Sequence, residues 1–230
     1  PDRVRVQSFE GEDWIRSMAG ADPADRIKDN SADGIDVEII FPNKGLAMWA
    51  TPDPIFSSAQ CAVWNDWAHE QFSSYGQAMH PVAAIATGDL DCAMAEIERV
   101  AKMGYTTLSL PCKPIWGAHD VDHVNYNLPH FDPMWALIQE ADLTMTFHVS
   151  TGRDPRASRG NGGAVINYVT HSLAPTIEPI ANLCASGVLE RFENLRFASV
   201  EAGIGWVPWL LDAMDEAYRK HHMWAVSYTH

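Results

Sequence analysis

The sequence predicts an α/β fold of the (β/α)8 TIM-type barrel class. Strand-like and helix-like segments alternate about five times along the 230 residues, which is the order of a parallel sheet covered by helices. Neither of the phosphate-binding fingerprints G-x-G-x-x-G and G-x-x-x-x-G-K-[ST] occurs, so a barrel is favoured over a doubly wound nucleotide-binding fold. A complete barrel has eight strands. We therefore expect a single, distorted barrel domain over residues 1–230 that lacks its first and last strands.

Capping residues and prolines mark the helices. Asp22 and Pro23 begin one helix, because Asp is a good N-cap and Pro fits the first helical position. Asp89 begins another helix, which Gly104 ends. The helical segments are expected at residues 14–18, 22–30, 57–75, 89–104, 132–141, 165–186 (interrupted at Pro175 and Pro179) and 206–221. The core-facing side chains of the long third helix are expected to be Ala59, Ala62, Val63, Trp67, Ala68 and Phe72.

Short apolar or alternating runs mark the strands. The run at 82–86 is continuously apolar, which is typical of a strand buried on both faces. The run at 143–148 alternates before it ends in Phe147-His148, and Thr and Phe favour strands. Strands are expected at residues 36–41, 82–86, 105–110, 143–148 and 195–200, with a further edge strand or linker at 3–7.

The composition excludes some functions. A hydrophobic fraction of 47% is that of a packed globular protein, and a formal net charge of −14 argues against binding nucleic acid or an anionic membrane. No apolar run approaches the roughly 20 residues that span a bilayer. The four cysteines have no C-x-x-C spacing and resemble reduced, mostly buried thiols, so we expect a cytoplasmic protein.

Two residues that follow predicted strands are candidates for chemistry. In a barrel, the residues just past the strands share one mouth, and here these positions include His148 and Glu201. His148 is a candidate metal ligand, and Glu201 is a candidate acid/base or second ligand. The structural alternatives are a histidine that bonds a backbone carbonyl at a strand end and a glutamate that favours the N-terminus of the next helix.

Two basic residues near the same mouth are candidates for binding a substrate carboxylate. Lys113 follows the strand at 105–110, and Arg153 follows the strand that ends at His148. Arg153 offers a bidentate fork for a carboxylate. Both lie in polar loops, where solvated side chains are the commoner case.

The chain resembles the amidohydrolase-related enzymes, the group that includes aminocarboxymuconate semialdehyde decarboxylase and aromatic acid decarboxylases. Phe147-His148 looks like the family's metal-binding strand. The resemblance covers roughly residues 33–225, and it implies a distorted barrel with one divalent metal, zinc or manganese. Further segments that carry it are Asn65-Asp66-Trp67, 93–104, Asp132-Pro133-Met134-Trp135 and 201–215.

Some of the family's metal ligands are missing from this sequence. No H-x-H or E-x-H pair occurs near the start, and Ser227-Tyr228-Thr229-His230 resembles the family's S-D-Y-P-H stretch without its Asp. Glu201 stands where the decarboxylases usually have a His. Of the family's ligands, only His148 carries over.

Two hypotheses from different functional classes follow. The first is a metal-dependent hydrolase or decarboxylase that acts on a small carboxylated or aromatic compound, with His148 as ligand and Glu201 as proton shuttle. The second is a catalytically inactive barrel that serves as a binding or subunit protein. A homodimer is also expected to be possible, because the loop around Trp49 would otherwise expose apolar area.

Overall fold

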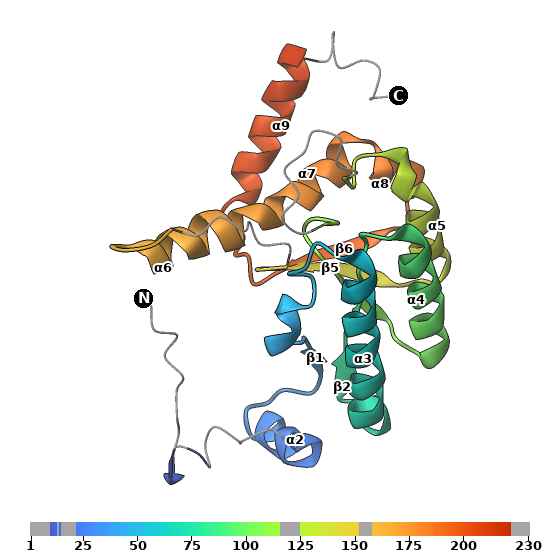
Figure 1. Ribbon diagram of the computed structural model, residues 1–230, viewed down its shortest axis with the longest axis vertical. Coiled ribbons are helices and arrows are strands. Elements are labelled where there is room, and N and C mark those ends of the chain that lie inside the picture. Colours follow the sequence, from blue (N-terminus) through green and yellow to red (C-terminus); the bar gives the residue numbers. More distant parts are fainter. Residues whose placement is uncertain (1–9, 13, 15–21, 116–124, 152–157, 222–230) are drawn as a thin grey trace.

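The structure is a parallel sheet covered by helices, as the sequence predicts (Figure 1). The computed structural model describes residues 10–12, 14, 22–115, 125–151 and 158–221. Every strand pairing is parallel: β1 pairs with β2, and a four-stranded sheet has the order β3-β4-β5-β6. The expected segment 3–7 lies outside the described residues. The strands are β1 (Glu38–Ile40), β2 (Met79–Pro81), β3 (Ala83–Ala84), β4 (Thr107–Leu110), β5 (Thr144–His148) and β6 (Arg196–Val200).

The strands curve as they do in a barrel. Val82 alone separates β2 from β3, and its N–H donates to the carbonyl of Ile40 at 3.0 Å, so the two sheets run into each other. On a flat sheet β1 and β5 would lie three strand spacings apart, about 14 Å. Yet the rings of Phe41, directly after β1, and His148, at the end of β5, have centroids 5.0 Å apart. Strong inward curvature toward one mouth accounts for this contact.

The helices begin and end largely where the capping residues predict. The Asp22 side chain accepts from the N–H of Ala24 at the start of α2, and Asp89 accepts from Cys92 at the start of α4. Gly104 ends α4 with a φ of 94°, which glycine adopts without strain. The helices are α2 (Pro23–Ala32), α3 (Pro54–Phe72), α4 (Leu90–Met103), α5 (Asp132–Glu140), α6 (Gly163–Ile166), α7 (Ile177–Ala185), α8 (Val188–Arg191) and α9 (Val207–His221), with a π-helix η4 (Asn167–Leu173) and the 3-10 helices η1 (Lys44–Ala47), η2 (Ser73–Tyr75), η3 (Pro129–Phe131) and η5 (Ala174–Thr176).

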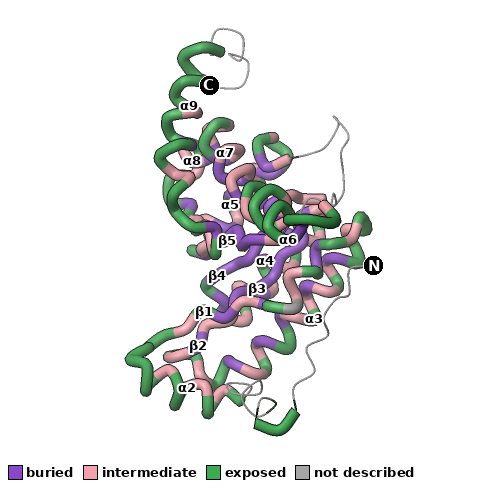
Figure 2. The backbone as a smooth tube through the Cα atoms, turned by 90° about the vertical axis from the view of Figure 1, so that its left-hand side faces the viewer, coloured by how far each residue is buried: buried purple, intermediate pink, exposed green. Residues whose placement is uncertain are grey.

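The main core lies between the four-stranded sheet and helices α4 and α5. Figure 2 shows the buried residues concentrated along β3, β4 and β5. Leu108 and Leu110 of β4 alternate with Thr107 and Ser109, and only the leucines belong to this core. The opposite, inward side of the sheet carries His148 at its carboxyl end. The largest fully buried side chains of the core include Trp135, Tyr126, Phe131, Phe147, Ile97 and Met145.

The face that α3 buries differs from the predicted one. Val63 is 70% exposed and Trp67 is 47% exposed, although apolar periodicity assigned both to the core. The buried positions are Ser57, Cys61, Asn65, Ala68 and Phe72. The buried stripe is therefore shifted round the helix, because the polar Asn65 makes hydrogen bonds to the sheet and must face it.

Trp49 is also placed differently from the prediction. It is only 4% exposed, and its indole N–H donates to the carbonyl of Ile85 at 2.9 Å. Trp49 itself therefore leaves no apolar area uncovered, whereas Ile55 and Phe56, at the end of the same segment, are 55% and 57% exposed. The homodimer stays a prediction.

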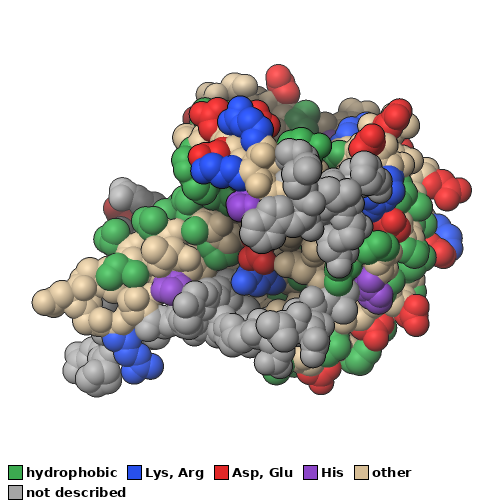
Figure 3. Space-filling model, turned by 90° about the horizontal axis from the view of Figure 1, so that it is seen from above, with side chains coloured by type: hydrophobic (Ala, Val, Ile, Leu, Met, Phe, Trp, Pro, Cys, Tyr) green, Lys and Arg blue, Asp and Glu red, His purple; other side chains and the backbone are tan. Residues whose placement is uncertain are grey.

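Other apolar side chains lie at the surface on the C-terminal third of the described chain. Figure 3 shows hydrophobic side chains along the projecting arm formed by α6 and η4. These are Val165, Ile166, Tyr168 and Val169, and α9 exposes Trp209, Leu211 and Tyr218. Each helix within the described ranges is too short or too polar to cross a bilayer.

Candidate site at the carboxyl ends of the strands

His148 is fixed in an orientation that leaves one ring nitrogen available. It is the last residue of β5 and is 6% exposed. Its Nδ1 lies 2.9 Å from the carbonyl oxygen of Val149, a group that only accepts, so Nδ1 carries the hydrogen. In the neutral ring the lone pair is then on Nε2. This is the arrangement in which histidine binds a metal, because the partner at one nitrogen sets the tautomer at the other.

Glu201 points its carboxylate at that nitrogen. It follows β6, the strand beside β5, and its Oε2 lies 3.3 Å from Nε2 of His148. The backbone of Glu201 has a φ of 59°, and Ser150, just past β5, has a φ of 71°. Non-glycine residues rarely adopt this left-handed conformation, and it clusters at functional sites. The structure thus brings the two candidate residues together where the backbone just past β5 and just past β6 is strained.

The donor pair fits part of a divalent-metal site. Two donors bound at about 2.0–2.1 Å to one tetrahedral ion lie about 3.3 Å apart, which is the separation of His148 Nε2 and Glu201 Oε2. Imidazole and carboxylate suit zinc and manganese. Across the described ranges, however, no three His, Cys, Asp or Glu side chains lie close enough together to hold an ion. The described residues therefore offer two donors for such an ion.

Thr151 and Cys112 hold the backbone of His148 from behind. The Thr151 hydroxyl donates to the His148 carbonyl at 2.7 Å, and the Cys112 N–H donates to the Thr151 carbonyl at 3.0 Å. The Cys112 thiol lies 3.6 Å from the same His148 carbonyl and 3.4 Å from the Thr151 hydroxyl. Burial raises the pKa of this thiol to about 12, so it stays protonated and acts as a packing group. The ends of β4 and β5 are thereby tied together under the imidazole.

Replacing Thr151 with valine is expected to lower the free energy of unfolding by about 1–2 kcal/mol. Threonine and valine side chains have nearly the same shape, so the change removes only the hydroxyl. The buried His148 carbonyl then loses its hydrogen bond from that hydroxyl. Thr151→Ser keeps the hydroxyl and should cost less than the valine change. Urea denaturation of the three proteins checks this, and equal stability of Thr151→Val and the wild type would contradict it.

The predicted carboxylate-binding residues are only partly described. Lys113 follows β4, and its ammonium lies 3.3 Å from Oε2 of Glu178 in the first turn of α7. Asn125 donates to the other oxygen of Glu178 at 3.0 Å. Arg153 lies outside the described residues. The candidate lysine is thus partnered by a carboxylate that no pattern in the sequence predicts at this place.

A buried hydroxyl pair packs below the same rim. The Tyr126 hydroxyl donates to the carbonyl of Pro111 and lies 2.7 Å from the Thr87 hydroxyl. Burial raises the pKa of Tyr126, so the phenol remains neutral. Thr87 lies three residues past β3 and is only 2% exposed. This pair joins the ends of β3 and β4 and is closed off from the surface.

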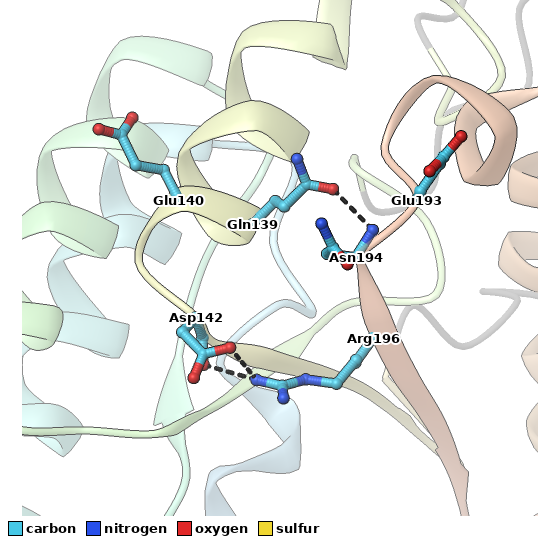
Figure 4. Close-up of a pocket in the computed structure, with 6 residues that line it drawn as sticks. All are labelled: Gln139, Glu140, Asp142, Glu193, Asn194 and Arg196. Atoms are coloured by element: carbon cyan, nitrogen blue, oxygen red, sulfur yellow. Dashed lines mark hydrogen bonds and ion pairs between the residues drawn. The ribbon is translucent and has the colours of Figure 1, made fainter.

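An open cavity of about 550 Å³ lies at the other end of the strands (Figure 4). The residues that line it lie before β5 and at or before the start of β6. His148 and Glu201, by contrast, lie at the end of β5 and directly after β6. Five strand residues separate the two ends by about 13 Å. Figure 4 shows Arg196 paired with Asp142 and Asn194 bonded to Gln139, so four of the six lining residues satisfy one another. In barrels this end serves stability, and we assign no chemistry to it.

Sequence reasoning missed Thr151, Asn125 and Glu178. Thr151 had a local signal, since a Thr three residues after a strand end can bond back to its carbonyl. Glu178 and Asn125 are 53 residues apart in sequence, and their contact depends on how α7 folds over the rim. No spacing rule links such residues.

Comparison with known proteins identifies the fold family. The amidohydrolase family model matches residues 15–229, which is most of the chain. No curated protein matches the sequence significantly.

Solved structures with similar folds include amidohydrolases and decarboxylases. An amidohydrolase from Mycobacterium avium subsp. paratuberculosis K-10 superimposes with a TM-score of 0.76 at 20% identity, covering 96% of this chain and 58% of its own. A 5-carboxyvanillate decarboxylase from Sphingomonas paucimobilis gives 0.62 at 22% identity, covering 87% of this chain and 57% of its own. A dihydroxybenzoic acid decarboxylase from Polaromonas sp. JS666, with bound manganese and an inhibitor, gives 0.60 at 16% identity, covering 83% and 58%. At these identities the likeness establishes the fold, and this chain spans less than two thirds of each relative's length.

Proposed function

The chain belongs to the amidohydrolase family, and from this premise we propose that it acts as a metal-dependent hydrolase or decarboxylase on a small carboxylated or aromatic compound. The observation that carries the proposal is the pair of His148 and Glu201 at the carboxyl ends of β5 and β6, with Nε2 and Oε2 3.3 Å apart. Barrel enzymes keep their reacting groups at this end of the strands. The solved dihydroxybenzoic acid decarboxylase with the same fold contains manganese, which supports a divalent ion here.

The roles of the residues follow from their geometry. His148 would hold the ion through Nε2, because its Nδ1 is already engaged by the Val149 carbonyl. A divalent metal at such a site supplies a Lewis acid that polarises a substrate oxygen or lowers the pKa of water. Glu201 is 61% exposed in its side chain, so it can reach a ligand and move a proton at its carboxylate. Lys113 would orient a substrate carboxylate by its charge, and we propose the same role for Arg153.

Elemental analysis of the purified protein after reconstitution with zinc or manganese tests the proposal. We expect about one ion per wild-type chain and less than about a tenth of that in His148→Ala, because the variant removes the one ligand that the described residues fix in place. His69→Ala is the matched control, since His69 lies near the end of α3, beside Tyr105, which precedes β4 and so lies at the opposite end of the strands from His148. It should keep the wild-type metal content.

Two results would contradict the proposal. One is an absence of bound metal in the wild type even after reconstitution, which would leave a binding or subunit role for the barrel. The other is an equal loss of metal in His148→Ala and His69→Ala, which would indicate nonspecific histidine binding.

A further inference from the structure

The ion pair between Lys113 and Glu178 holds both oxygens of its carboxylate in place. Oε2 of Glu178 faces the Lys113 ammonium at 3.3 Å, and Oε1 accepts from the Asn125 amide at 3.0 Å. Asn125 is itself fixed, because its own oxygen accepts from the N–H of Tyr126 at 2.8 Å. Lys113 has no such second anchor among the described residues, so its flexible side chain is the part of the cluster that can move.

This cluster lies next to the backbone that carries His148. Lys113 directly follows Cys112, whose thiol contacts the His148 carbonyl. Both charges of the ion pair act on the buried Cys112 thiol: the Glu178 carboxylate raises its pKa and the Lys113 ammonium lowers its pKa. The ion pair is therefore at the rim where β4 and β5 end.

The ion pair remains accessible to a ligand. The Lys113 side chain is 36% exposed and that of Glu178 is 38% exposed. Ion pairs this exposed contribute little to stability, so exchanging one carboxylate partner for another costs little. The ammonium has three hydrogens to donate, and Glu178 lies in the direction of only one of them. An arriving carboxylate meets a lysine whose charge is already largely compensated.

We propose that Glu178 is a specificity-determining residue that competes with the carboxylate of a ligand for the ammonium of Lys113. The inference rests on the proposed function, which supplies the carboxylated ligand. Its consequence is that Glu178 weakens the binding of simple monocarboxylates. Removing its charge while keeping its shape should strengthen that binding.

Calorimetric titration with benzoate tests this competition. Glu178→Gln keeps an oxygen for Asn125 but frees the ammonium, and we expect the Kd for benzoate to fall about threefold relative to the wild type, within the range of an exposed ion pair. Lys113→Met should abolish the gain, so Lys113→Met and the double variant Lys113→Met/Glu178→Gln should bind benzoate equally weakly. Asp132→Asn is the matched control: it also removes one negative charge and frees Arg191 from an ion pair of similar exposure. It should leave the Kd unchanged.

Several outcomes would overturn the inference. They are an unchanged Kd in Glu178→Gln, an equal gain in Asp132→Asn, which would reflect net charge alone, and a gain that survives in the double variant. Metal content measured on the same samples keeps this inference separate from the proposed function. A wild type without metal would contradict the proposed function, whereas the ratio of the Kd values would still decide the role of Glu178.

Discussion

Replacing Asn65 with alanine is expected to lower the free energy of unfolding by about 3–5 kcal/mol. Asn65 is 0% exposed, and its side chain pairs with both backbone groups of Ala84 in β3: Oδ1 accepts at 2.7 Å and Nδ2 donates at 2.9 Å. Nδ2 also donates to Glu96 at 2.6 Å. The amide thus takes the place of a neighbouring strand. Its loss would leave two buried backbone groups and a carboxylate oxygen without this partner, at about 1–3 kcal/mol for each unsatisfied group.

Urea denaturation of Asn65→Ala beside Asp66→Ala measures this effect. Asp66 is the next residue on α3, but it is exposed and its contact is an ion pair with Arg99. Exposed pairs contribute about 0–1 kcal/mol, so the control should be nearly as stable as the wild type. A loss below about 1 kcal/mol in Asn65→Ala would show that water or a shifted backbone replaces the amide.

The same asparagine explains where sequence reasoning about the fold failed. Local signals sufficed for α4, where Asp89 and Gly104 mark both ends, and for β5, whose last residue is His148. They failed on the orientation of α3, because apolar periodicity gives weight to Val63 and none to a polar residue that faces the core. Hydrogen bonds offset the cost of desolvating a buried Asn only when a specific partner lies opposite it. Here that partner is the backbone of Ala84, which is 19 residues away in the sequence.

The candidate site was predictable to the extent that strand ends were. His148 and Glu201 each follow from a rule about one strand, and parallel neighbours then bring the two residues together. Glu178 could not be found this way, because its position depends on the interrupted helical segment that passes through η4 and η5 before α7 begins. The site therefore divides into a part that is set by strand order and a part that is set by tertiary packing.

Replacing Glu201 with glutamine is expected to reduce turnover by about 10²–10⁴-fold, the usual contribution of a general acid or base. The substitution keeps the size of the side chain and removes its proton-accepting charge beside Nε2 of His148. Because His148 is the proposed metal ligand, the metal content should stay at about one ion per chain. The measurement is an assay of carboxylated aromatic compounds, run together with elemental analysis. Loss of the metal would instead assign Glu201 as a second ligand.

The backbone of Glu201 allows a second test of the same residue. With a φ of 59°, this position favours glycine, so Glu201→Gly should lose turnover as the glutamine variant does while raising the free energy of unfolding by about 0.5–1 kcal/mol. Ser150→Gly is the matched control, because Ser150 has a φ of 71° at the end of β5 and takes no proposed part in the chemistry. It should gain similar stability and keep full turnover. If the strained backbone at Glu201 is retained because the carboxylate is needed for turnover, both glycine variants gain stability but only Glu201→Gly loses turnover. If Glu201→Gly is instead less stable than the wild type, the carboxylate stabilises the fold through its contact with His148.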